Sequence, residues 1–264
     1  MSIASESALD TVLRRDRLVV AAALAALTVA AWLYLLYMAA HMAMPEMAMA
    51  MPAMHSWSWV ELGALVVMWT VMMVAMMVPS AAPMIVMFAT INRRRREQQG
   101  PFVPTAVFLA GYLVVWTGFS VLAALAQWAL HAVALMSPMM VTTSPLLGGV
   151  LLVAAGVFQW TRLKAACLVR CRSPLSFIVT SWREGRGGAF RMGLHHGLYC
   201  LGCCWLLMAL LFVAGVMNLL WVAAIAIFVL LEKIVPRGEL VGRVAGIVLV
   251  VAGLLVLSRG VLGP

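Results

Sequence analysis

The amino-acid sequence predicts an all-α fold, a polytopic bundle of transmembrane helices. Of the 264 residues, 65% are apolar and only 10% are charged, and the mean hydropathy is +1.06. A soluble domain of this size would need more polar surface than this composition offers. The apolar residues are also grouped into runs of about 20, the length that crosses a bilayer as a helix. We therefore expect a membrane protein.

Seven apolar runs have about the length of a membrane span. They are expected to form one helical domain at 18–258, with a polar cytoplasmic lead before it at 1–17 and a C-terminal tail after it at 259–264. The predicted spans are residues 18–38, 62–88, 104–130, 145–161, 195–215, 217–234 and 240–258.

The basic residues indicate the orientation of the bundle. The formal net charge of +9 would also suit a nucleic-acid-binding protein. With the N-terminus placed inside, however, 17 of the 18 Lys and Arg residues fall on the cytoplasmic side and only Arg259 falls outside. The positive-inside rule predicts this asymmetry, which also brings the cations to anionic lipid headgroups. We expect the N-terminus in, the C-terminus out, and contact with the lipid bilayer but not with nucleic acid.

A methionine-rich loop is expected on the outer side at residues 41–55, between the first two spans. Prolines interrupt it and polar residues flank it, so core packing does not readily explain it. Thioethers are soft, neutral donors that do not form disulfides, which suits capture of Cu(I) or Ag(I) in an oxidising compartment. The alternative is an interfacial apolar loop of biased composition. The candidate ligands are His41, Met42, Met44, Met47, Met49, Met51 and His55.

The second span also carries methionines at helical spacing. Met68, Met72 and Met76 lie at i, i+4 and i+8, with Met73 and Met77 beside them. Flexible core packing is one interpretation of such a stripe. Two prolines four residues apart follow it and would free backbone carbonyls in mid-membrane, where a broken helix is tolerated if it lines protein or a cavity. A functional methionine ladder is therefore the other interpretation.

The fifth span begins with the densest group of metal-binding residue types. His196, Cys200, Cys203 and Cys204 fall within an arc of about 100° on one helix face, because i, i+4, i+7 and i+8 share a face. Thiolates and imidazoles are the ligands that copper(I), zinc and iron–sulfur clusters prefer, and polar groups inside a span usually mark a site. A metal site is the leading hypothesis for this face.

Three further candidate ligands are expected at the same inner level. Cys167 and Cys171 are one helical turn apart in the segment 162–194, which is expected to lie at the inner membrane interface. Glu232, at the end of the sixth span, is a ligand, a proton acceptor or a hydrogen-bond partner of the histidine. The ordinary alternative is that it pairs with Lys233 or a neighbouring arginine at the membrane edge.

Several of these motifs resemble a known family. They are the run Met72–Met84, Gln159, Leu163–Lys164 with Cys167 and Cys171, Gly197 with Cys200, Gly202–Met208, Met217–Asn218, and Glu232–Lys233 with Pro236. Together they are similar to the bacterial predicted metal-binding integral membrane proteins, a domain of otherwise unknown function, over about residues 60–240. The resemblance implies metal binding in a bacterial cytoplasmic membrane but no settled activity. The methionine-rich loop lies outside these motifs.

One pattern joins the candidate ligands to a function. All five cysteines are predicted on the inner side, whereas His41, His55 and the loop methionines are predicted outside. Thiols need a reducing compartment to remain ligands, and thioethers do not. We therefore expect a copper(I)-binding membrane protein that acts in metal transport, homeostasis or delivery, with a metallochaperone or metalloenzyme as its partner.

Other interpretations stay open at this point. Zinc is the alternative metal. Cys200 and Cys203, or Cys203 and Cys204, would exchange disulfides with Cys167 and Cys171 in a membrane redox protein. In a scaffold subunit of a membrane complex, the same cysteines would pack as small hydrophobes. ATPase signatures are missing from the sequence, and no catalytic residue is predicted.

Overall fold

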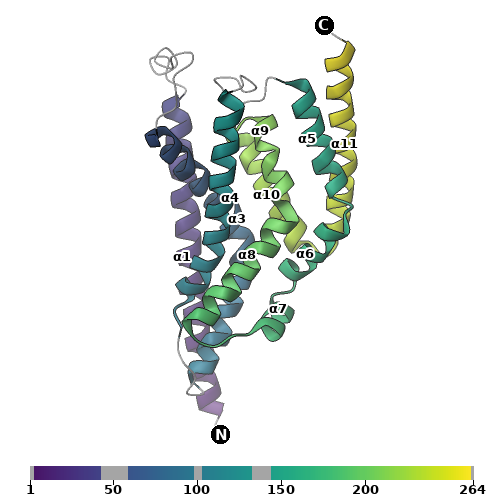
Figure 1. The fold of residues 1–264 in the computed structure, drawn as a ribbon. Helices are drawn as coiled ribbons and strands as arrows, with labels where there is room; N and C mark the ends of the chain where they lie inside the picture. Colours follow the sequence, from purple (N-terminus) through teal and green to yellow (C-terminus); the bar gives the residue numbers. More distant parts are fainter. Residues whose placement is uncertain (1–2, 43–58, 98–102, 133–143, 263–264) are drawn as a thin grey trace.

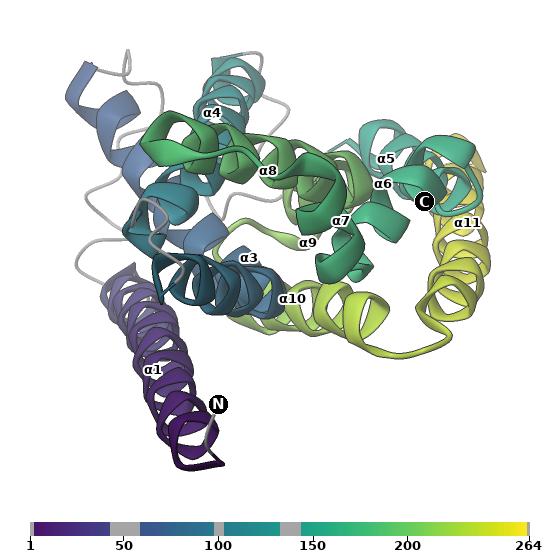
Figure 2. The same ribbon diagram turned by 90° about the horizontal axis from the view of Figure 1, so that it is seen from below.

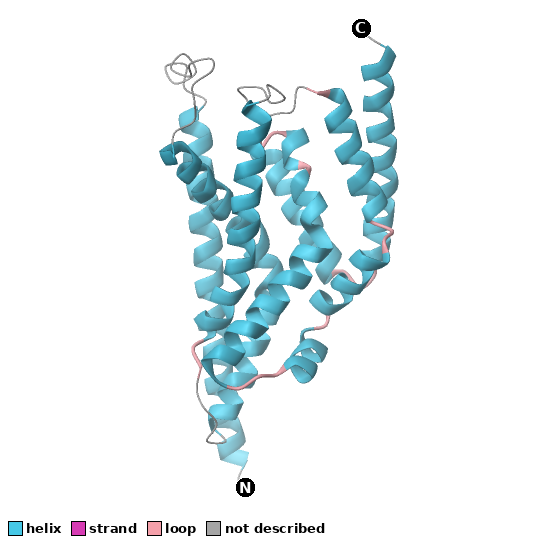
Figure 3. Cartoon of the chain, in the orientation of Figure 1, coloured by secondary structure: helices cyan, strands magenta, loops and turns pink. Residues whose placement is uncertain are grey.

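The chain folds into helices joined by short connections. The structure, a computed structural model, describes residues 3–42, 59–97, 103–132 and 144–262, and no strand occurs within these ranges (Figures 1 and 3). The all-α prediction is confirmed for this part of the chain. The helices are α1 (Ile3–Met42), α3 (Trp59–Glu97), α4 (Thr105–Ala132), α5 (Pro145–Phe158), α6 (Arg162–Arg172), α7 (Pro174–Ser181), α8 (Gly185–Ala209), α9 (Leu211–Ala214), α10 (Leu219–Ile234) and α11 (Gly238–Leu262).

Five of the described helices are long and apolar enough to cross a membrane. They are α1, α3, α4, α11, and α8 with the short α9 that continues it. α5 and α6 meet at an angle of 63° and together would make a sixth. α10 has 16 residues, slightly fewer than the roughly 17 to 25 of a full span. Each predicted run therefore lies largely in a helix, whereas the count of seven spans and the inward N-terminus stay predictions.

The fourth predicted run ends earlier than expected, and the helix after it takes a new direction. α5 stops at Phe158 and α6 starts at Arg162, because Thr161 has an extended backbone and caps α6. The Thr161 hydroxyl accepts a hydrogen bond from the Lys164 amide at 3.3 Å, the usual role of a threonine before a helix. The bend turns α6, which carries two of the cysteines, against α8.

The segment 162–194, predicted to lie at the inner interface, contains α6, α7 and the first turns of α8. α8 begins at Gly185, well before the predicted start of the fifth span at residue 195. Gly185 has a φ of 73°, in the left-handed region that favours glycine, so the chain turns into the helix there. The cysteine-bearing helix is consequently longer than the apolar pattern indicates.

Glycines bring helix backbones together at two interfaces. α4 and α8 approach most closely where Gly111 and Gly193 face the partner backbone. α5 and α11 lie side by side at one edge of the molecule (Figures 1 and 2), with Gly149 opposite Gly253 and Gly156 opposite Gly246. Small residues allow such close approach between membrane helices, where packing and not hydrophobicity holds helices together.

Replacing Gly193 by Ala is expected to destabilise the protein by roughly 1–3 kcal/mol or more, the usual cost of overpacking. An added methyl group would overlap the backbone oxygen of Phe108 and lie 3.1 Å from the Tyr112 amide nitrogen, so α4 and α8 would have to separate. The matched control is Gly118→Ala on α4, where an added Cβ meets no atom within 4 Å. It should gain about 0.5–1 kcal/mol from helix propensity. Thermal unfolding in detergent measures both, and equal stability of the two variants would contradict the tight interface.

Candidate metal centre

The cysteines of α8 lie in the interior of the bundle, where side chains of α3, α4, α6 and α10 meet them. Cys200, Cys203 and Cys204 are fully buried, and His196, one turn earlier, is 1% exposed. All five cysteines of the chain carry free thiols. The face of α8 that carries the candidate metal ligands is therefore buried in the core of the bundle.

Cys200 is held by two polar side chains that come from other helices. Lys233 on α10 donates from Nζ to the Cys200 Sγ at 3.0 Å and to the Ser80 Oγ at 2.9 Å. The Tyr112 hydroxyl on α4 lies 3.1 Å from the same sulfur and donates to the Met77 carbonyl oxygen at 3.0 Å. A buried ammonium group is costly unless an anion lies against it, so this geometry suits a Cys200 thiolate paired with Lys233.

The other sulfur atoms form a continuous chain of contacts around Cys200. The Cys204 Sγ lies 3.9 Å from the Met77 Sδ on α3. The thiols of Cys203 and Cys204 both donate to the Cys200 carbonyl oxygen, at 3.1 and 3.0 Å, and they also interact with each other. On the other side, Cys203 interacts with Cys171 of α6. We call Met77, Cys171, Cys200, Cys203 and Cys204 the sulfur cluster.

The spacing of the sulfur cluster fits a soft metal ion better than a hard one. With metal–sulfur bonds of about 2.3 Å, two sulfurs at the corners of a trigonal site lie about 4 Å apart, close to the 3.9 Å between Met77 and Cys204. Among the described residues, no three His, Cys, Asp or Glu side chains are grouped as a metal ion would need. A site here would therefore depend on the thioether together with thiols, a donor set that favours Cu(I) over Zn(II).

His196 is a buried imidazole that lacks hydrogen-bond partners. In the described part of the chain, neither Nδ1 nor Nε2 has a partner. Its ring packs against Phe108, Tyr112 and Phe177, with the nearer ring centroids 5.6 Å away. Leaving a buried polar group without a partner costs about 1–3 kcal/mol of stability. A ring nitrogen of His196 is therefore available to bind a ligand, one helical turn from Cys200.

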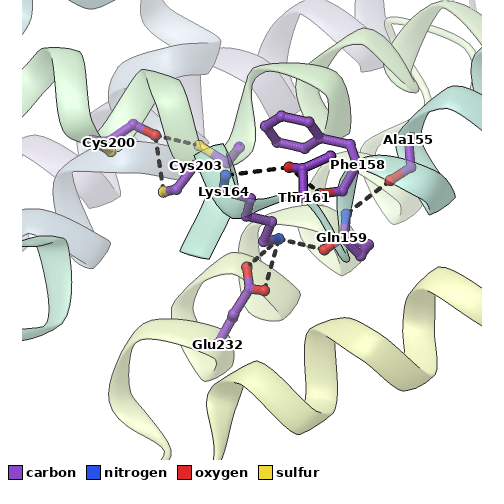
Figure 4. A network of polar contacts seen from close by, with 9 residues as sticks. Ala155, Phe158, Gln159, Thr161, Lys164, Cys200, Cys203 and Glu232 are labelled. Atoms are coloured by element: carbon purple, nitrogen blue, oxygen red, sulfur yellow. Dashed lines mark hydrogen bonds and ion pairs between the residues drawn. The ribbon is translucent and has the colours of Figure 1, made fainter. Parts of the chain in front are cut away.

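Glu232 lies in an ion pair and not among the sulfur atoms. The Lys164 Nζ on α6 is 2.7 Å from one carboxylate oxygen and 2.8 Å from the other. Lys164 also donates to Gln159, whose amide is fixed by a hydrogen bond to the Ala155 carbonyl oxygen (Figure 4). Of the interpretations of Glu232 left open above, the structure shows ion pairing, with Lys164 as its partner.

The remaining candidate ligands fall outside the sulfur cluster. Cys167 is only half-buried and faces Gly202, where an added Cβ would lie 2.7 Å from its sulfur. His41 lies near the end of α1 with its ring against Tyr37, at a centroid distance of 4.1 Å. The Met42 side chain and the residues Met44, Met47, Met49, Met51 and His55 lie outside what the structure describes.

One member of the sulfur cluster and three of its neighbours are absent from the sequence-based set of candidate ligands. They are Met77, and Ser80, Tyr112 and Lys233. The sequence contains a signal for each: Met77 belongs to the methionine stripe of the second predicted span, and a serine, a tyrosine and a lysine inside or at the edge of apolar runs usually have a reason to be there. Their helices are far apart in sequence, so the signal does not say what they contact.

The comparisons with known proteins point to copper. A family model described as PpoB2, copper chaperone, matches residues 66–256, well over half of the chain. This range contains the whole sulfur cluster and every motif of the resemblance noted above, but not the loop at 41–55. No curated protein and no solved structure matches the chain. The protein therefore belongs to the PpoB2 family of copper chaperones.

Proposed function

We propose that this chain is an integral protein of the bacterial cytoplasmic membrane that binds Cu(I) at the sulfur cluster and delivers it to a metalloprotein. The observation that carries the proposal is the convergence of Met77 with four thiols in the bundle interior, with a lysine against Cys200. The copper chaperone family and the apolar helices support it. Copper is here the cargo of the protein.

The charges around the sulfur cluster suit a monovalent ion. Lys164 and Glu232 neutralise each other, which leaves Lys233 and the Cys200 thiolate as the second pair. If a second thiol releases its proton, a Cu(I) ion bound by that thiolate and by the Cys200 thiolate carries one negative charge as a complex. The Lys233 ammonium group then balances this charge, so the site stays neutral overall. Cys204, which also contacts the Met77 thioether, is the nearest candidate for the second thiol.

Delivery requires a route from the buried cluster to a partner, and α6 provides one. Cys171 contacts Cys203 inside, and Cys167, one turn away on α6, is half-exposed. A partner that offers thiols or imidazoles could take the ion by ligand exchange from these cysteines, without any change in the oxidation state of the metal. Exchange between soft ligands therefore suffices, and no ATPase is needed.

Metal analysis of the purified protein tests the proposal. After anaerobic titration in detergent against a Cu(I) chelator, we expect one Cu(I) ion per chain to be retained, and Zn(II) to be lost under the same conditions. X-ray absorption should show sulfur neighbours at about 2.3 Å. Retention of Zn(II) as firmly as Cu(I), or a spectrum with only nitrogen and oxygen neighbours, would contradict the proposed cargo.

A further inference from the structure

Six of the seven methionines of α3 are buried in the interior of the bundle. Between residues 68 and 84 this helix has six methionines, each at most 2% exposed, although the helix itself lies partly at the surface. In the same stretch Val71 and Val74 are partly exposed, whereas Val78 is buried together with the methionines. The buried methionines are Met68, Met72, Met73, Met76, Met77 and Met84.

Thioethers supply most of the large buried side chains of this stretch of α3. A core needs only apolar volume, which leucine or valine would also supply, so packing alone does not require methionine at these positions. Met68, Met72 and Met76 follow one another at one-turn spacing, about 6 Å along the axis. Met77 lies next to Met76 and contacts Cys204 of α8. The thioethers therefore form a line that ends at the sulfur cluster.

The line continues beyond α8 through thiols in mutual contact. Cys204 interacts with Cys203, and Cys203 interacts with Cys171 of α6, which packs against α8. Sulfur-bearing side chains thus follow one another from α3 through α8 to the short helix α6 (Figure 1). From Met68 to Met77 the helical rise alone is about 14 Å, nearly half of the roughly 30 Å apolar core of a bilayer.

We propose that this line is a conduction path for soft monovalent cations, Cu(I) and Ag(I), from the Met68 end of α3 to Cys171 on α6. The proposal rests on the proposed Cu(I) function and adds how the ion reaches the sulfur cluster. The ion moves by exchange of one sulfur ligand for the next and keeps its charge and oxidation state. Where it reaches a neutral thiol, the S–H bond breaks as the bond to the metal forms, and the proton passes to the thiolate that the ion leaves or to that of Cys200.

The chemistry of the donors gives the path a direction and a selectivity. Neutral thioethers bind soft ions weakly, whereas thiolates also neutralise the charge, so affinity rises toward the cysteines. The stretch from residue 68 to 84 contains no charged residue. The Born cost of burying an ion rises with the square of its charge, so a divalent ion such as Zn(II) would meet about four times the barrier of Cu(I). The path should therefore reject Zn(II).

Ion uptake into sealed vesicles tests the path. The chain is reconstituted into vesicles of phosphatidylethanolamine and phosphatidylglycerol with a silver-responsive dye inside, and Ag(I) is added outside. The variant M68L/M72L/M76L replaces thioethers by side chains of similar volume, a change that cores tolerate. We expect Ag(I) uptake at least tenfold slower than for the unaltered chain, with the number of Ag(I) ions bound per chain in detergent unchanged. The control M38L/M87L/M217L changes methionines that are only partly buried and should keep the original rate.

The outcomes separate the path from the binding site. If the triple variant binds Ag(I) fully and takes it up at the original rate, the path is wrong and the proposed function stands. If the unaltered chain binds neither Ag(I) nor Cu(I), the proposed function itself fails. If the variant does not fold, the uptake of Ag(I) and of Zn(II) by the unaltered chain is compared instead. Ag(I) uptake at least tenfold faster than Zn(II) uptake supports the path. Equal uptake of the two ions, or none beyond protein-free vesicles, overturns it.

Discussion

Replacing Glu232 by Gln is expected to lower the free energy of unfolding by about 3–5 kcal/mol, the cost of leaving one charge of a buried pair unpaired. The side chains of Lys164 and Glu232 are only 3% and 1% exposed, so water cannot replace the lost carboxylate. Lys164 would keep Gln159 as its neighbour, and an amide oxygen compensates an ammonium group far less than a carboxylate does. Thermal unfolding in detergent, followed by tryptophan fluorescence, measures the change.

Two further variants show whether burial is the cause. Glu184 makes a comparable ion pair with Arg95 at 3.1 Å, but the two side chains are 68% and 44% exposed. Glu184→Gln should therefore change stability by no more than about 1 kcal/mol. In the double variant K164M/E232L both charges are gone, and stability should return close to its original value, because apolar replacements of buried pairs are often neutral. A double variant as unstable as Glu232→Gln alone would contradict this account of the pair.

Replacing Cys204 by Ser is expected to weaken Cu(I) binding by roughly 100-fold or more, since even the outer partners of metal ligands contribute 10- to 100-fold to affinity. Cys204 is the thiol that contacts the Met77 thioether, and a hydroxyl group is a hard donor that Cu(I) does not favour. Anaerobic competition with a Cu(I) chelator gives the affinity. Thermal unfolding of the metal-free variant shows separately whether the fold is retained.

The matched control for this change is Cys167→Ser. Cys167 lies on the neighbouring α6 and is half-exposed, outside the sulfur cluster, so its loss should reduce affinity less than threefold. A second pair is Met77→Leu, expected to weaken binding about tenfold, and Met73→Leu, which alters an equally buried methionine outside the sulfur cluster and should not weaken it. If Cys167→Ser weakens binding as much as Cys204→Ser, the site lies nearer to the surface of α6.

Composition and periodicity predicted the helical class correctly, but not the boundaries of the helices. The bend between α5 and α6 depends on Thr161, a residue that fits a helix interior and a helix cap alike. The early start of α8 depends on Gly185, which the apolar pattern places outside the span because the residues after it are basic and glycine-rich. In both places a single capping or turning residue decided the structure.

The candidate site shows a similar division. Periodicity on one helix placed His196, Cys200, Cys203 and Cys204 on one face, and burial of all four agrees with that placement. Periodicity within one helix could not predict which side chains of different helices contact each other. That Lys233 contacts Cys200 while its neighbour Glu232 contacts Lys164 follows from how α10 packs against both α8 and α6, and nothing local in the sequence encodes it.

The ion pair between α6 and α10 also constrains the order in which the bundle can assemble. Its two members are 68 residues apart in the chain, and a ribosome delivers the earlier one first. Until α10 emerges, Lys164 has no carboxylate to neutralise it and α6 cannot settle into an apolar environment. Cys171 is therefore expected to reach its companions on α8 only after α10 has emerged, late in the synthesis of the chain.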